Sequence, residues 1–373
     1  MRAYLLMMVI AAAVTFFGTF AVLRLAHRYK IYPQIRSRDV HTKPTPRLGG
    51  IAMFAGFLIT IVIAGFIGWF KSVYAEPLQI MAILAAAFLI TLIGFLDDLY
   101  DLDWSLKLAG QFVVAGILAW QGVQIVSLPI AGLTIGSFGI SFIATVFLTV
   151  LVMNAVNFID GLDGLVAGVV FIGTSVFFAY SYVLAQQTSP TNYFNLASLL
   201  SAIVIGMCLG FLPYNWHRAK IFMGDSGAML LGLLMATTAL TVTGQIDPQT
   251  VSRGELVPAF IPLILPLAIL ILPLLDFSLA VVRRLRAGKS PFAADREHLH
   301  HRLQDFGHTH LGSVLVFYVW TALISISCLL YFFWPAWAVM IFTVIGLAGC
   351  LVFTLWPLIQ RRKTLNSGAF VNV

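Results

Sequence analysis

Long uninterrupted apolar segments are the feature that most limits what this chain can fold into. A run such as FLITIVIAGFIGWF, residues 57–70, contains no charged residue, and a helix of roughly 20 apolar residues crosses a hydrocarbon core. Hydrophobic residues make up 60% of the chain and charged residues only 10%, which excludes a soluble multidomain protein. We count eleven candidate spans, at residues 3–23, 48–70, 78–96, 106–121, 139–158, 163–184, 196–213, 227–243, 257–282, 312–334 and 336–359.

These spans predict an all-α, polytopic membrane protein. The continuous apolar runs lack the alternation of barrel strands. Ten spans is the competing count, because the fourth run is short and the fifth begins weakly. We expect one catalytic transmembrane domain over residues 1–360, followed by a short basic tail at 361–373. The polar segments are predicted to be cytoplasmic loops, at residues 24–47, 97–106, 157–163, 214–226 and 283–311.

The distribution of basic residues predicts the orientation. With eleven spans and the N-terminus outside, 19 of the 22 Lys and Arg residues fall on one side. By the positive-inside rule that side is cytoplasmic, and so is the C-terminus. A ten-span chain would instead place the basic tail RRK outside.

Acidic residues concentrate at the predicted inner ends of the spans. The stretch GFLDDLYDLDW, residues 94–104, contains Asp97, Asp98, Asp101 and Asp103. An isolated Asp at a membrane edge is often simply solvated. Two carboxylates about 5 Å apart, however, repel by about 3 kcal/mol at an effective dielectric constant of 20, so a converging set would raise its own pKa values or bind a cation. Oxygen ligands without neighbouring His or Cys favour Mg²⁺, with Mn²⁺ as the alternative.

A second polar stretch is NAVNFIDGLDG, residues 154–164. Its amides and acids, Asn154, Asn157, Asp160 and Asp163, follow one another at steps of three residues, so successive members are neighbours on a helix. The glycines at 161 and 164 predict a tight turn at the helix end. A polar pocket is the favoured interpretation, and amides that join helices are the alternative.

A third stretch, YNWHRAKIFMGDSG at residues 214–227, precedes a predicted span. Asp225 or Ser226 is expected to cap the start of that helix. Asn215 and the cations Arg218 and Lys220 occupy the same loop, where they could hold phosphate together with backbone N–H groups.

Three further features carry candidate binding residues. The loop at 288–310 contains His298, His300 and His301 beside Arg296, which suits phosphate or sugar contact. A helical HLHH has no pair of histidines four residues apart, which disfavours a zinc site of the HExxH type.

Lys43 lies in the segment HTKPTPRLGG, and Asp276 lies inside the ninth predicted span. An acid within a span is a functional candidate by default, here for substrate binding, with a buried pair to a neighbouring helix as the alternative. Together these features predict a transferase that joins a soluble phosphorylated donor to a lipid phosphate or alcohol. A transporter or flippase for a lipid-linked phosphate, or an inactive scaffold, is the alternative.

Four of these segments carry a resemblance to a known family. DDLYD, NAVNFIDGLDG, YNWHRAKIFMGDSG and REHLHHRL resemble, in this order, the signature segments of the polyprenyl-phosphate N-acetylhexosamine-1-phosphate transferases. The resemblance implies transfer of an amino-sugar 1-phosphate from a UDP-sugar to undecaprenyl phosphate, with release of UMP and a requirement for Mg²⁺. It also implies a bacterial inner membrane, an active site on its cytoplasmic face, no nucleic-acid partner, and compatibility with a homodimer.

The resemblance also implies roles for individual residues. Asp225 is similar to the metal ligand, with Asp98 as a second expected ligand. Asp97 and Asp98 resemble the pair near the metal and the lipid phosphate, and one of them is proposed as the base. Lys43 is similar to the phosphate-binding lysine. The other matched residues are expected at nucleotide, donor or catalytic positions: Asn157, Asp160, Asp163, Asn215, Arg296, His298, His300 and His301.

The histidine segment further suggests which donor is used. SPF, DR and HLHH are similar to the branch that uses UDP-N-acetylglucosamine, as in the initiating enzymes of common antigen, O-antigen and teichoic acid. The branch with a peptide-bearing donor typically has a longer histidine run. We expect direct displacement at the β-phosphorus, with a double displacement through an aspartyl intermediate as the alternative.

Overall fold

The computed structural model describes residues 1–31, 45–125, 137–188, 195–243, 268, 271–286, 288 and 299–366. Within these ranges every regular element is a helix. The α-helices are α1 (Arg2–Tyr29), α2 (Gly49–Gly65), α3 (Pro77–Tyr100), α4 (Trp104–Trp120), α5 (Phe138–Phe158), α6 (Leu165–Thr188), α7 (Leu196–Asn215), α8 (Gly224–Thr243), α10 (Ile271–Arg286), α11 (Leu299–Asp305), α12 (His310–Leu330) and α13 (Ala336–Asn366). Two short 3₁₀ helices, η1 (Gly68–Phe70) and η2 (Val73–Ala75), connect α2 to α3.

The predicted all-helical membrane architecture is confirmed. Eight of the described helices are long and apolar enough to cross a membrane, and α2 and α4 are shorter apolar helices. The ninth predicted span, 257–282, lies mostly outside the described residues, and α10 covers only its second part. The total of eleven spans and the orientation of the termini therefore stay predictions.

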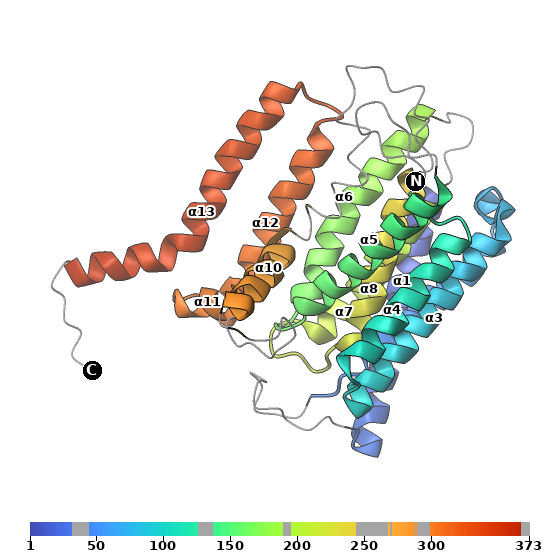
Figure 1. Ribbon diagram of the computed structural model, residues 1–373, viewed down its shortest axis with the longest axis horizontal. Coiled ribbons are helices and arrows are strands. Elements are labelled where there is room, and N and C mark those ends of the chain that lie inside the picture. The colour runs from blue at the N-terminus through green and yellow to red at the C-terminus, as the bar shows by residue number, and fades with distance from the viewer. Residues whose placement is uncertain are drawn as a thin grey trace.

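Helix α8 lies at the centre of the bundle. It packs against α2, α3, α5 and α7, whereas α13 lies at the edge of the molecule beside α12 (Figure 1). In the most apolar stretch of α8, 89% of the residues are buried inside the protein, against 11% in α13. The residues at the start of α8 are therefore surrounded by several other helix ends.

Glycines allow α2 and α3 to approach the first turn of α8 closely. A Cβ atom added to Gly50 would lie 2.3 Å from the backbone nitrogen of Gly227, and one added to Gly94 would lie 2.4 Å from that of Ser226. The N–H groups of Gly49 and Gly50, which start α2, donate to the carbonyls of Phe222 and Met223 at 2.9 Å. These bonds satisfy donors that a helix start leaves without intrahelical partners.

We predict that Gly94→Ala destabilises the protein, because the new methyl group meets backbone that cannot move aside. The expected cost is about 1–3 kcal/mol, measured as a lower thermal midpoint in detergent. Gly116→Ala in α4 is the matched control, since its Cβ would come no closer than 3.9 Å to Phe142. Alanine there should be neutral or stabilising by up to about 1 kcal/mol. Equal midpoints for the two variants would contradict the close packing.

Candidate active site

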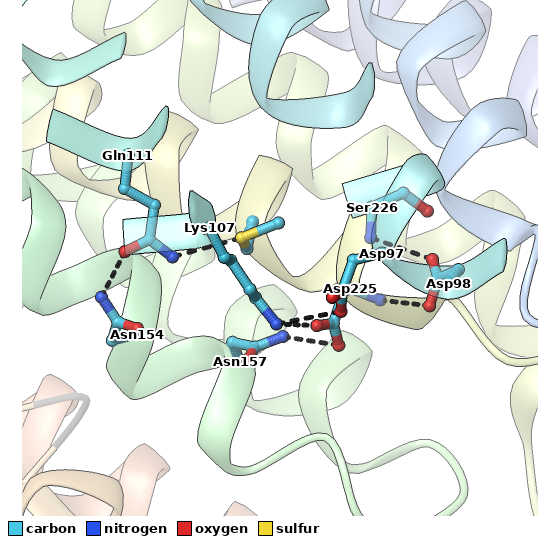
Figure 2. A network of polar contacts seen from close by, with 9 residues as sticks. Asp97, Asp98, Lys107, Gln111, Asn154, Asn157, Asp225 and Ser226 are labelled. Atoms are coloured by element: carbon cyan, nitrogen blue, oxygen red, sulfur yellow. Dashed lines mark hydrogen bonds and ion pairs between the residues drawn. The ribbon is translucent and has the colours of Figure 1, made fainter. Parts of the chain in front are cut away.

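Three helix ends and the first turn of α8 form a compact charged cluster (Figure 2). The Lys107 ammonium, on the first turn of α4, contacts Oδ2 of Asp225 and lies 3.2 Å from Oδ2 of Asp97. The Asn157 amide, at the end of α5, donates to the other oxygen of Asp225 at 3.0 Å. The structure thus brings together Asp97, Asn157 and Asp225, which are far apart in the sequence. We call Asp97, Lys107, Asn157 and Asp225 the acidic cluster.

Asp98, next to the acidic cluster, holds the start of α8. Its Oδ1 accepts the backbone N–H of Asp225 at 3.0 Å, and its Oδ2 accepts that of Ser226 at 3.2 Å. The expectation that Asp225 or Ser226 caps this helix is wrong, because both lie within its first turn and the capping carboxylate comes from α3. Asp98 was also expected to bind metal, and this stays a prediction; in the structure each of its oxygens accepts one of these N–H groups.

The other two acids of the first motif lie outside the acidic cluster. Asp101 ends α3 in the left-handed conformation, with φ 54°. Asp103 caps α4, since its carboxylate accepts the N–H of Ser105 at 2.9 Å, and this hydrogen bonding lowers the pKa of Asp103. Within this motif, therefore, only Asp97 belongs to the acidic cluster, and Asp98 lies next to it.

Lys107 was missed as a site residue by the sequence reasoning, which used it only to assign orientation. A signal was present in the sequence. Asp103 is followed two positions later by Ser105, a pattern that starts a helix, and Lys107 then falls on its first turn beside the acids. The cap of α4 is thus what directs this cation toward Asp97 and Asp225.

A pair of amides, the half-buried Asn154 and the buried Gln111, lies beside the acidic cluster. The Asn154 Nδ2 donates to Oε1 of Gln111 at 2.6 Å, and Nε2 of Gln111 lies 3.2 Å from the sulfur of Met229 (Figure 2). Gln111 lies one turn after Lys107 on α4 and is fully buried. The alternative that amides join helices is therefore correct for Asn154, whereas Asn157 contacts the acidic cluster.

Asn215 and Asp163 tie together the loops beside the acidic cluster. The buried Asn215 accepts the N–H of Gly164 at 3.1 Å and donates to the carbonyl of Ile221 at 3.0 Å. The buried Asp163 accepts the N–H groups of Arg218 and Ala219 at 3.0 and 3.2 Å. Both predicted site residues thus bind backbone in this structure, and their roles toward a substrate stay predictions.

Asp160 lies in the turn between α5 and α6, outside both helices. The pKa of this carboxyl is raised to about 7, mainly by burial and also by the negative charges of Asp98 and Asp163, while Arg47 opposes the change. A carboxyl of this kind exchanges its proton near neutral pH, a property typical of groups that move protons during catalysis.

Several predicted site residues cannot be placed against the acidic cluster. Lys43, Arg296 and His298 lie outside the described residues. The backbones of Asp276, His300 and His301 are helical, in α10 and α11, but their side chains are also outside the described part of the structure.

Apolar helices around a charged cluster at their ends define an integral membrane protein with a polar site built for charged ligands. Comparison with known proteins identifies the family. Residues 80–243 match glycosyl transferase family 4. A decaprenyl-phosphate N-acetylglucosaminephosphotransferase of Mycolicibacterium smegmatis is 38% identical over 94% of this chain and 87% of its own length. The chain therefore belongs to glycosyl transferase family 4, among polyprenyl-phosphate sugar-phosphate transferases, which confirms the resemblance found in its motifs.

Two further relatives extend the comparison. A probable undecaprenyl-phosphate N-acetylglucosaminyl 1-phosphate transferase of Bacillus subtilis is 35% identical over 83% of this chain and 79% of its own length. An undecaprenyl-phosphate alpha-N-acetylglucosaminyl 1-phosphate transferase of Escherichia coli is 29% identical over 91% and 90%.

We predict that Asp160→Asn stabilises the substrate-free protein, and more so at pH 8 than at pH 5. The pKa of Asp160 is higher in the folded than in the unfolded protein, so stability falls as pH rises from about 4 toward about 7, and a neutral amide removes that loss. The expected gain at pH 8 is at least about 1.4 kcal/mol, the equivalent of one pKa unit. Thermal midpoints at the two pH values measure it.

The exposed Asp305 on α11 supplies the control for this variant. Asp305→Asn changes an exposed carboxylate and should leave the midpoint close to that of the wild type. A lower midpoint for Asp160→Asn at pH 8 would show that the ionised carboxylate is stabilising, which contradicts a raised pKa.

Proposed function

We propose that this protein transfers N-acetylglucosamine 1-phosphate from UDP-N-acetylglucosamine to a polyprenyl phosphate. An oxygen of the lipid phosphate attacks the β-phosphorus of the donor, the bond from that phosphorus to the bridging oxygen breaks, and UMP leaves. The relatives' names support this reaction, and they include both decaprenyl and undecaprenyl acceptors. We retain undecaprenyl phosphate as the acceptor, with decaprenyl phosphate as the alternative, in the first membrane step of a cell-envelope glycan.

The single observation that carries this proposal is the ion pairing of Lys107 with both Asp97 and Asp225. Phosphoryl transfer depends on fixed positive charge near the reacting oxygens. Lys107 supplies such a charge. Asp97 and Asp225 both pair with the Lys107 ammonium. An entering phosphate would therefore meet their negative charge unless a further cation neutralises it.

The acidic cluster has the chemistry of a magnesium site. Asp97 and Asp225 offer carboxylate oxygens and Asn157 a side-chain amide, and Mg²⁺ prefers oxygen ligands of this kind. Asp225 and Asp97 would hold the ion, with Asn157 beside them. A bound Mg²⁺ neutralises the negative charge that develops on the diphosphate oxygens, and Mn²⁺ fits the same ligands.

The chain's own groups prepare the site for an anionic substrate. Asp98 fixes the first turn of α8 through the N–H groups of Asp225 and Ser226, and this orients the Asp225 carboxylate. The start of α8 adds the positive partial charge of a helix N-terminus. Of Asp97 and Asp98, Asp97 is the better placed to act as a base, because Asp98 is engaged by backbone N–H groups.

The proposed reaction predicts UMP release with UDP-N-acetylglucosamine as donor. Purified protein in detergent is assayed with undecaprenyl or decaprenyl phosphate and Mg²⁺, beside UDP-N-acetylgalactosamine and UDP-MurNAc-pentapeptide. We expect release with the first donor and none after EDTA, restored by added Mg²⁺. Release only with another donor would change the sugar assignment. Absence of release with all three would favour the transporter alternative.

We predict that Asp225→Asn abolishes turnover in a protein that still folds, since it removes a carboxylate from the acidic cluster. Lys107→Met should slow UMP release by at least about tenfold, because the fixed cation is lost. Lys71→Met, in the loop between α2 and α3, is the matched lysine control and should leave the rate unchanged. Near-normal turnover by Asp225→Asn would remove this residue from the proposed metal site.

A further inference from the structure

A second group of metal-ligand side chains lies beside the acidic cluster and is separate from it. Asp163 comes from the turn after α5, His217 from the turn after α7, and His310 is the first residue of α12. One ligand atom from each of these three side chains lies within 4.8 Å of the other two. Asp163 is buried, His310 is half-buried and His217 is exposed.

The backbone around this group holds the three side chains together. Oδ2 of Asp163 accepts the N–H groups of Arg218 and Ala219, which directly follow His217. The rings of His217 and His310 lie with centroids 5.5 Å apart. The turn of Asp163 and the loop of His217 are thus fixed relative to each other.

Helix α12 is fixed to the same turn at a second point. The hydroxyl of Tyr318 donates to the carbonyl of Gly164 at 2.5 Å, and the Tyr318 ring lies 6.4 Å from that of Trp216. Tyr318 and His310 are eight positions apart on α12 and so lie near the same face. The position of His310 near Asp163 therefore follows from the packing of α12.

The three ligands match the chemistry of zinc. Two imidazoles and one carboxylate are a ligand set that Zn²⁺ accepts, with ligand bonds of about 2.0–2.2 Å. Tetrahedral ligands at that distance lie about 3.4 Å apart, so side-chain rotations from the present spacing are enough to close the site. Imidazole distinguishes this group from the acidic cluster, whose described ligands are oxygens and which suits Mg²⁺.

We propose that Asp163, His217 and His310 bind one zinc ion, with the fourth ligand position open to water. The ion joins the start of α12 to the loop after α7 and the turn after α5. Because α11 packs on α12, zinc also restrains the end of the segment that contains His300 and His301. This proposal does not depend on the transferase activity.

The first test measures zinc content. Full-length protein is purified with a histidine-free tag, dialysed against buffered Zn²⁺, and analysed by inductively coupled plasma mass spectrometry. We expect about one zinc ion per chain, and a loss of most of it in His217→Ala and in His310→Ala. His217 is exposed, so its removal should leave the fold intact, which size-exclusion chromatography and circular dichroism check.

Matched variants separate this site from the other metal-ligand groups. His27→Ala replaces an exposed histidine of α1, Asp225→Asn alters the acidic cluster, and the His300→Ala/His301→Ala double variant alters α11. All three should keep their zinc. Added Zn²⁺ should raise the thermal midpoint of the wild type but not of His217→Ala, and Co²⁺ should give the visible absorption of a tetrahedral site only where His217 is present.

The proposal is overturned by any of three results: wild-type protein that holds no more zinc than His217→Ala, zinc that is lost in the α11 double variant, or zinc that is lost in Asp225→Asn. In the first case Asp163, His217 and His310 are neighbouring side chains that bind no metal ion. In the other two cases the ion belongs to another group of ligands.

Discussion

The structure of the site depends on the capping of α8 by Asp98. The first N–H groups of a helix have no intrahelical partners, and at the start of α8 Gly224 and Ser226 are buried while Asp225 is half-buried. The Asp98 carboxylate satisfies those of Asp225 and Ser226. Since Gly94 lies one turn before Asp98 on α3 and contacts the same backbone, capping and close packing are two aspects of one contact. That contact determines where the Asp225 side chain points.

The overall fold could largely be predicted from the sequence, because the length of an apolar run is determined by consecutive residues. Each predicted span that falls within the described residues corresponds to a helix, and the turn predicted at Gly161 and Gly164 follows the end of α5. Capping between different helices is not local. Nothing in the sequence near Asp225 indicates that its helix is capped from α3, so the sequence favoured Asp225 or Ser226 itself.

The site was only partly accessible for the same reason. Polar residues at span ends identified Asp97, Asn157 and Asp225, because such residues are costly in a membrane protein without a partner. Their exact partners depended on packing. Asn154 and Asn157 are alike in sequence, but one faces Gln111 and the other faces Asp225. Asp163, His217 and His310 are too far apart in the chain for any spacing pattern to join them.

Electrostatics favours the proposed cation at the acidic cluster. Two carboxylates and one ammonium have a formal net charge of about −1, and the carboxylates belong to helices held rigidly by the Asp98 cap and the glycine contacts. A diphosphate donor and a lipid phosphate would both be repelled by this charge. A divalent cation bound by Asp97 and Asp225 would reverse its sign and free Lys107 to turn toward a phosphate. The ion pair seen in the structure is therefore best understood as the resting arrangement, in which Lys107 balances charges that the proposed metal would balance during turnover.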